Sequence, residues 1–107
     1  MNKKLYRTGP YADFFSQGVQ AGNVLTLAGQ LGDNEDGSVP ADIKSQMINC
    51  YNNIKSVLSE FGATLDNVID ETWFVTDVNE CMENVSDIFD ERENIYGCKP
   101  EVSQTLV

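Results

Sequence analysis

Apolar residues in the middle of the chain recur at the three- and four-residue spacing of one helical face. In residues 40–61 this face consists of Ile43, Met47, Cys50, Ile54, Val57, Leu58 and Phe61. Pro40 suits the first turn of a helix, Asp42 suits the positive end of the helix dipole, and Gly62 is a C-terminal stop signal. The pattern predicts an amphipathic helix that covers a sheet with one face and exposes the other.

A second helical pattern begins after Asp77-Val78-Asn79, which is typical of a helix cap, and runs to about Tyr96. Its apolar face contains Cys81, Val85, Ile88 and Phe89, and the same spacing extends to Arg92. Gly97 marks the end of this predicted helix.

Apolar, β-branched and aromatic stretches predict four strands. They cover residues 16–20, 24–30, 68–76 and 102–107, and the first two flank a turn at Ala21-Gly22-Asn23. The order strand, strand, helix, strand, helix, strand indicates an α+β fold, a single mixed β-sheet with two helices packed on one face. A chain of 107 residues has room for one domain, residues 1–107, and its final strand has no successor to pair with.

The net charge of −10 results from seven Lys and Arg residues against 17 Asp and Glu residues, without a basic cluster after residue 7. Such a chain repels phosphate backbones, which disfavours a nucleic-acid partner. Neither a membrane-spanning run nor a secretory signal is present in the sequence. We therefore expect a cytoplasmic protein with no nucleic-acid or membrane partner.

The absence of histidine excludes Ser-His-Asp and Cys-His catalytic groups, His-ligated metals and a histidine general base. Cys50, Cys81 and Cys98 have the spacing of neither a disulfide framework nor a zinc site, so we expect reduced and mostly buried thiols. The acidic loop that begins at Asp33 departs from a calcium loop because its glycine is fifth instead of sixth, so we expect a solvated turn. No metal is expected, and the chemistry is left to carboxylates, hydroxyls, backbone groups and water.

Four local patterns follow one another along the chain: Gly9-Pro10-Tyr11; residues 16–23 leading into Ala28-Gly29-Gln30; residues 53–58 before Phe61-Gly62-Ala63; and residues 74–79. Together they cover nearly the whole chain and resemble the YjgF/RidA family, also known as the endoribonuclease L-PSP family.

This resemblance implies a YjgF/RidA fold, similar to that of the small trimeric chorismate mutases, and a homotrimer with ligand clefts between subunits. The typical enzyme of the family is a cofactor-free deaminase that hydrolyses reactive 2-imino or enamine acids to 2-keto acids and ammonia. In such an enzyme an arginine after a Pro-Ala pair binds the substrate carboxylate with both of its nitrogen donors. We therefore expect a small keto or imino acid ligand.

The resemblance also implies which residues form the ligand site. Gly29 matches the glycine whose backbone lines the cleft, and Tyr11 matches an N-terminal aromatic residue. Because Ala12-Asp13-Phe14-Phe15 is longer than the common pattern, Phe14 or Phe15 is an alternative for the aromatic position, and core or subunit packing is another reading of all three rings.

The largest departure from the family lies in the last residues. Val102 stands where the arginine belongs, Glu101 stands where alanine belongs, and Ser103 follows. Arg92 is a possible replacement cation, and Glu101 and Glu71 are the carboxylates available to position water. The family continues for about one further strand, which this chain is expected to lack, leaving the edge of its last strand uncovered unless a partner strand covers it.

Three functions remain open at this point. An imine deaminase fits the family pattern but lacks the arginine at position 102. A non-catalytic trimeric protein that binds a small molecule, or an accessory protein, would keep the clefts without the chemistry. A ribonuclease is disfavoured by the negative charge and by the lack of histidine.

Overall fold

Three antiparallel strands begin the fold in the computed structural model, which covers residues 1–107. They are β1 (Lys3–Tyr6), β2 (Gly18–Ala21) and β3 (Val24–Leu27), with β2 in the middle. Gly22, with φ of 59°, takes the left-handed conformation that the tight turn between β2 and β3 requires. The predicted hairpin is confirmed, whereas β1 was not expected from the sequence, because Lys3-Lys4-Leu5-Tyr6 lacks an apolar alternation.

The predicted central helix is α1 (Ile43–Ser59). The Asp42 carboxylate caps it by accepting a hydrogen bond from the Ser45 backbone N–H at 2.9 Å. Gly62, with φ of 71°, follows its C-terminal end. The apolar face of α1 is packed against the strands, in agreement with the sequence pattern.

The polar face of α1 differs from the prediction because part of it binds the long loop after β3 instead of solvent. Asn49 donates to the Gly32 carbonyl at 3.0 Å, and Asn53 donates to the Leu31 carbonyl at 3.1 Å. Gln46 donates to the Pro40 carbonyl at 2.7 Å. These side-chain amides satisfy loop carbonyls that have no strand partner, and they fix the path of residues 28–42.

The second half of the chain contains the short helix η1 (Leu65–Asn67), β4 (Asp70–Trp73), α2 (Val78–Glu83), α3 (Val85–Tyr96) and β5 (Ser103–Leu106). The predicted second helix is thus divided at Asn84, where φ and ψ are −111° and 18°. The Asn84 side chain donates to the Glu80 carbonyl at 2.9 Å and so competes with helix continuation.

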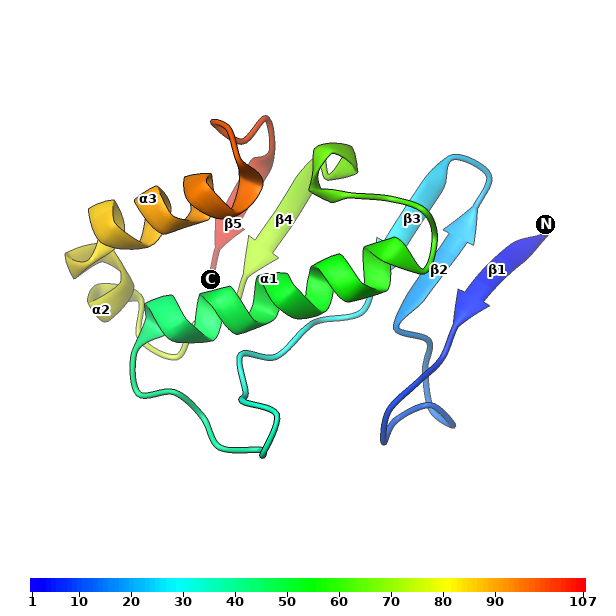
Figure 1. Ribbon diagram of the computed structural model, residues 1–107, viewed down its shortest axis with the longest axis horizontal. Helices are drawn as coiled ribbons and strands as arrows, with labels where there is room; N and C mark the ends of the chain where they lie inside the picture. The colour runs from blue at the N-terminus through cyan, green and yellow to red at the C-terminus, as the bar shows by residue number, and fades with distance from the viewer.

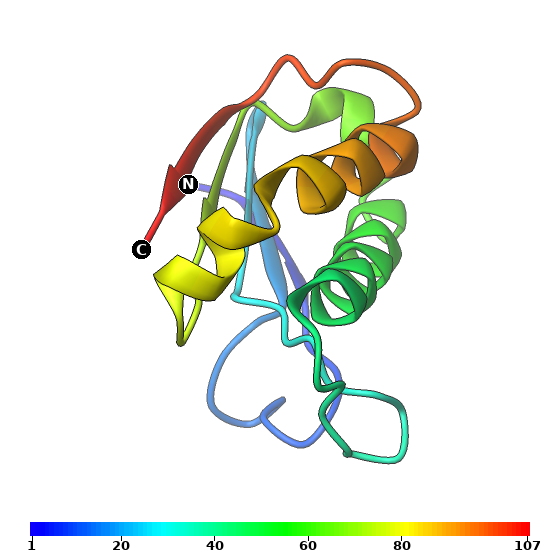
Figure 2. The same ribbon diagram turned by 90° about the vertical axis from the view of Figure 1, so that its left-hand side faces the viewer.

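The fold class is confirmed as α+β, but the strands form two hydrogen-bonded sheets instead of one. No strand pairing joins β3 to β4; β5 pairs in parallel with β4, with Asp70 opposite Ser103 and Trp73 opposite Leu106. All five strands nevertheless lie in one layer, and α1 and α3 cover the same side of it (Figures 1 and 2).

The core lies between the helices and the strands. Its buried residues are Met47, Tyr51, Leu58, Leu65, Cys81, Ile88 and Tyr96. The opposite side of the strand layer has no covering element in the chain (Figure 2). None of the helices combines the length and the apolar character needed to cross a membrane.

Candidate functional site

The predicted aromatic residues lie in the loop between β1 and β2. The rings of Tyr11 and Phe15 stack with their centroids 5.7 Å apart and an angle of 15° between their planes. The backbone N–H groups of Phe14 and Phe15 both donate to the Tyr11 carbonyl, which closes a tight turn. Because Phe14 is 79% exposed and unstacked, Tyr11 and Phe15 together form the flat apolar surface of this loop.

Gly29 lies at the same end of the first sheet as this loop. The Gln17 N–H donates to the Tyr6 carbonyl at 2.7 Å, and the Ala28 N–H donates to the Gln17 carbonyl at 2.9 Å, so the three chain segments remain paired beyond the strands. A methyl group on the Gly29 Cα would meet no atom within 4 Å. The backbone of Gly29 is therefore accessible from the side on which a side chain would stand.

Val102, Ser103 and Glu101 lie at the start of β5. Val102 is half-buried and packs against the core, and Glu101 is exposed. The Ser103 hydroxyl donates to the Asp70 carboxylate at 2.7 Å and also lies 3.1 Å from the Ile69 carbonyl. The three residues stand at the opposite end of the strand layer from the ends of β1 and β3 (Figure 1). A single chain therefore does not bring the two groups of predicted site residues together.

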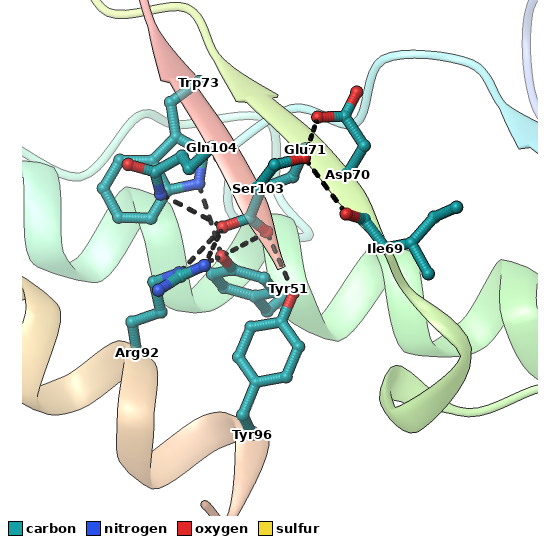
Figure 3. A network of polar contacts seen from close by, with 9 residues as sticks. All are labelled: Tyr51, Ile69, Asp70, Glu71, Trp73, Arg92, Tyr96, Ser103 and Gln104. Carbon is teal, nitrogen blue, oxygen red and sulfur yellow. Dashed lines mark hydrogen bonds and ion pairs between the residues drawn. The ribbon is translucent and has the colours of Figure 1, made fainter. Parts of the chain in front are cut away.

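A buried polar network lies between the strands and the helices, centred on Glu71 of β4 (Figure 3). Its Oε2 accepts hydrogen bonds from the hydroxyls of Tyr51 at 2.8 Å and Tyr96 at 2.9 Å. Its Oε1 accepts from Arg92 Nε at 2.7 Å and from Gln104 Nε2 at 3.0 Å. One carboxylate thus binds side chains from α1, α3 and β5.

Arg92 is the cation of this network, and its side chain is only 9% exposed. Burial opposes its charge, but the hydrogen bond to Tyr51 and the negative charge of Glu71 outweigh burial and raise the pKa of Arg92. Its Nη2 lies 2.7 Å from the Glu71 Oε1 without hydrogen-bond geometry and has no other partner. Arg92 is therefore bound within the core, and it is not free to replace the arginine that the resemblance places at position 102.

The two tyrosines of the network stay protonated at neutral pH. Burial and then the charge of Glu71 raise the pKa of Tyr51 and of Tyr96 well above the ordinary value of 10.0. Both hydroxyls remain donors, and Glu71 is fully engaged, so it does not position water in the manner considered from the sequence. The network is suited to hold helices on strands and not to exchange a proton.

The remaining hollows and polar groups are less suited to catalysis or ligand binding. A surface hollow of about 370 Å³ lies between the end of α1, η1 and the end of α3, and contains none of the predicted site residues. No three Cys, Asp or Glu residues are grouped closely enough to hold a metal ion. Cys81 is buried, Cys50 is half-buried and Cys98 is exposed. Burial raises the pKa of the Cys81 and Cys50 thiols.

Comparison with known proteins decides the family. Residues 6–104 match the family described as Endoribonuclease L-PSP. The chain belongs to the L-PSP family.

Two relatives of this L-PSP protein come from Escherichia coli K12. The RutC family protein YjgH is 31% identical over 93 residues, which are 87% of this chain and 69% of YjgH. A 2-iminobutanoate/2-iminopropanoate deaminase is 34% identical over 73 residues, which are 67% of this chain and 54% of the deaminase. The chain therefore spans only about half the length of that deaminase.

A solved structure supports the same assignment. The 1.2 Å crystal structure of the YJGF gene product from E. coli has a TM-score of 0.75 at 28% sequence identity, covering 97% of this chain and 85% of that one. The resemblance stated from the four local patterns is thereby confirmed, as is the α+β fold of this L-PSP protein.

The ion pair between Glu71 and Arg92 is the main feature that the sequence reasoning missed. The signal was present in the pattern: Arg92 falls on the apolar face of the second predicted helix, and Glu71 alternates with Trp73 on the central strand. Two opposite charges on faces predicted to point inward indicate a buried pair. In this L-PSP protein that pair lies in the core, beside β5, whose Gln104 also donates to Glu71.

Proposed function

We propose that this L-PSP protein hydrolyses reactive 2-imino and enamine acids to 2-keto acids and ammonia. In this reaction, water adds to the carbon of the C=N bond, the C–N bond breaks, ammonia leaves, and a C=O bond forms. The similarity to the E. coli 2-iminobutanoate/2-iminopropanoate deaminase is the observation that carries the proposal. The exposed Gly29 backbone and the stacked Tyr11 and Phe15 rings, at the same end of the first sheet, support it, because a small planar acid fits against a flat apolar surface.

We further propose that the chain is a homotrimer in the cytoplasm, with ligand clefts between subunits. The side of the strand layer away from the helices supports an oligomer because it leaves large apolar side chains uncovered. These are Leu5, Val24, Phe74 and Val107, which are 52%, 63%, 81% and 56% exposed. A cleft between subunits is also the arrangement in which residues from opposite ends of the strand layer can meet. Sedimentation equilibrium should give three times the chain mass of 11.9 kDa; a monomeric mass at micromolar concentration would contradict the trimer.

Hydrolysis is tested with 2-iminobutanoate or 2-iminopropanoate generated in situ by oxidation of the 2-amino acid. Release of ammonia and of the keto acid should be faster with micromolar protein than in buffer alone. The two products should appear in equal amounts because one water molecule consumes one imine. The proposal fails if the protein leaves both rates at the buffer value.

A second candidate function is binding of the same small acids without catalysis. The observation that favours it is Val102, which is packed against the core at the position where the resemblance places a carboxylate-binding arginine. A protein that binds 2-oxobutanoate but does not accelerate imine hydrolysis would establish this candidate. Ribonuclease activity has no comparable support, because the chain has a net charge of −10 and no histidine.

A further inference from the structure

An anionic ligand needs a cation in a chain whose net charge is −10. We propose that Arg7 is the residue that binds the ligand carboxylate. This inference rests on the proposed function, since that function makes the ligand a small 2-imino or 2-keto acid. It assigns the charge recognition to the loop between β1 and β2 instead of to position 102.

Three of the seven cationic side chains already have partners within the protein and are unavailable for a ligand. Arg92 is buried against Glu71, with 2.7 Å between Nη2 and Oε1. Lys44 pairs with Asp87 at 3.2 Å. Lys4 donates to the Glu60 carbonyl at 2.9 Å and lies 5.2 Å from the centre of the Phe61 ring.

The backbone places Arg7 at the same end of the first sheet as the predicted ligand residues Tyr11, Phe15 and Gly29. Arg7 follows Tyr6, the last residue of β1, and Tyr6 is in register with Gly18 of β2, which is in register with Leu27 of β3. Arg7 is thus level with Ala28 at the same end of the sheet. Two strand spacings, about 10 Å, separate the first and third strands there, and Gly29 follows directly.

The guanidinium group of Arg7 is already directed toward the aromatic loop. Its Nη1 donates to the Ala12 carbonyl at 2.9 Å, in the same turn that stacks Tyr11 on Phe15. This is its only hydrogen bond, the residue is exposed, and no carboxylate, including that of Asp13 in the same loop, forms an ion pair with it. A partly anchored guanidinium with free N–H groups is suited to a carboxylate, which it can bind with two parallel hydrogen bonds.

The remaining free cations are less suited to this role. Lys99 precedes β5 at the opposite end of the strand layer, and its side chain forms no hydrogen bond or ion pair (Figure 1). Lys55 lines the surface hollow beside α1, on the helical side of the molecule. Lys3 begins β1, at the far end of that strand from Tyr6. Of these side chains, only that of Arg7 is anchored in the loop of the stacked rings and lies at the end of the sheet from which the Gly29 segment continues.

The test measures binding of 2-oxobutanoate and of its neutral amide, 2-oxobutanamide, by NMR titration of the full-length chain. Four variants are compared with the wild type: Arg7→Gln, Arg7→Lys, Lys99→Gln and, as a control with the same charge change on the strand that precedes Arg7, Lys3→Gln. We expect Arg7→Gln to weaken 2-oxobutanoate binding by about 10- to 100-fold. Lys3→Gln should change it by less than about threefold, and Arg7→Lys should retain part of the affinity. The amide should bind all five proteins equally weakly.

Two controls separate a binding effect from a structural one. The thermal unfolding midpoint of Arg7→Gln should equal that of the wild type, because Arg7 is exposed. The amide signals of Gly29 and Phe15 should move on titration of the wild type but not of Arg7→Gln. A Lys99→Gln variant is included because loss of binding in Lys99→Gln, with Arg7→Gln unaffected, would overturn the assignment, as would equal losses in Arg7→Gln and Lys3→Gln.

The two proposals can fail separately. If the wild type hydrolyses imines and Arg7→Gln keeps the same kcat/KM, only the assignment of Arg7 is overturned. If the wild type binds 2-oxobutanoate through Arg7 but does not hydrolyse imines, the assignment stands and the deaminase function is overturned. If the wild type does neither, both are overturned.

Discussion

At the scale of single residues, Glu71 has the most connected side chain in the protein. It accepts hydrogen bonds from Arg92, Gln104 and two tyrosines, all of them from other elements. A buried ion pair contributes little compared with an apolar pair of the same shape, but removing one partner leaves an uncompensated charge. Removing one partner from this network should therefore destabilise the protein more than replacing the whole ion pair with apolar residues would.

We expect Arg92→Met to lower the free energy of unfolding by about 3 to 5 kcal/mol, because Glu71 would remain buried and charged without its cation. Lys44→Met is the matched control; it breaks an exposed ion pair and should cost less than about 1 kcal/mol. Urea denaturation measures both. A loss for Arg92→Met as small as that for Lys44→Met would show that the buried pair is not formed as described.

The tyrosines of the network predict a dependence of stability on alkaline pH. Their pKa values are raised in the folded protein, so above pH 10 the unfolded state loses protons that the folded state retains. The stability that the two protonated tyrosines contribute is therefore fully present below pH 10. The free energy of unfolding falls as the pH rises further, by at most about 1.4 kcal/mol per pH unit for each tyrosine. The free energy of unfolding, measured by urea denaturation between pH 9 and 11.5, should fall less steeply with pH for Tyr96→Phe than for the wild type. Equal slopes would contradict the prediction.

At the scale of elements, the loop of residues 28–42 is fixed on α1 by close approach as well as by hydrogen bonds. A Cβ atom on Gly32 would lie 2.7 Å from the Gln46 Cβ and 2.8 Å from the Gln46 carbonyl oxygen. Gly29, in the same loop, has open space at the equivalent position. The two glycines therefore have different roles, one in packing and one in the candidate ligand site.

We expect Gly32→Ala to destabilise the protein by about 1 to 3 kcal/mol, because the loop and α1 must separate. Gly29→Ala should change stability by less than about 0.5 kcal/mol, yet it should lower kcat/KM for imine hydrolysis by about 10- to 100-fold, because the methyl group would displace the ligand. Urea denaturation and the product-release assay measure the two effects. The candidate site is wrong if Gly29→Ala has full activity.

The sequence predicted elements whose patterns depend on neighbours along the chain. The face of α1 from Met47 to Leu58 and the hairpin around Gly22 are such cases. It did not predict β1 or the division between α2 and α3, because Lys3–Tyr6 lacks apolar alternation and Asn84 ends a helix through its side chain. The helical spacing places Arg92 on an apolar face, but its contact with Glu71 across the core is not encoded by the spacing along one helix.

At the scale of the whole molecule, the candidate site is divided. Tyr11, Phe15 and Gly29 lie at one end of the strand layer, whereas Val102 and Ser103 lie at the start of β5 at the other end (Figure 1). The uncovered apolar side of the layer offers a surface on which copies of the chain can associate. The family resemblance could identify these candidate residues from the sequence, but their separation within one chain became evident only in three dimensions.

The most direct test of the proposed imine hydrolysis is the rate at which the wild-type chain releases keto acid from freshly generated 2-iminobutanoate. We predict a rate that increases in proportion to protein concentration in the micromolar range and that yields one ammonia for each keto acid. A rate equal to that in buffer at every protein concentration would contradict the proposed deaminase function.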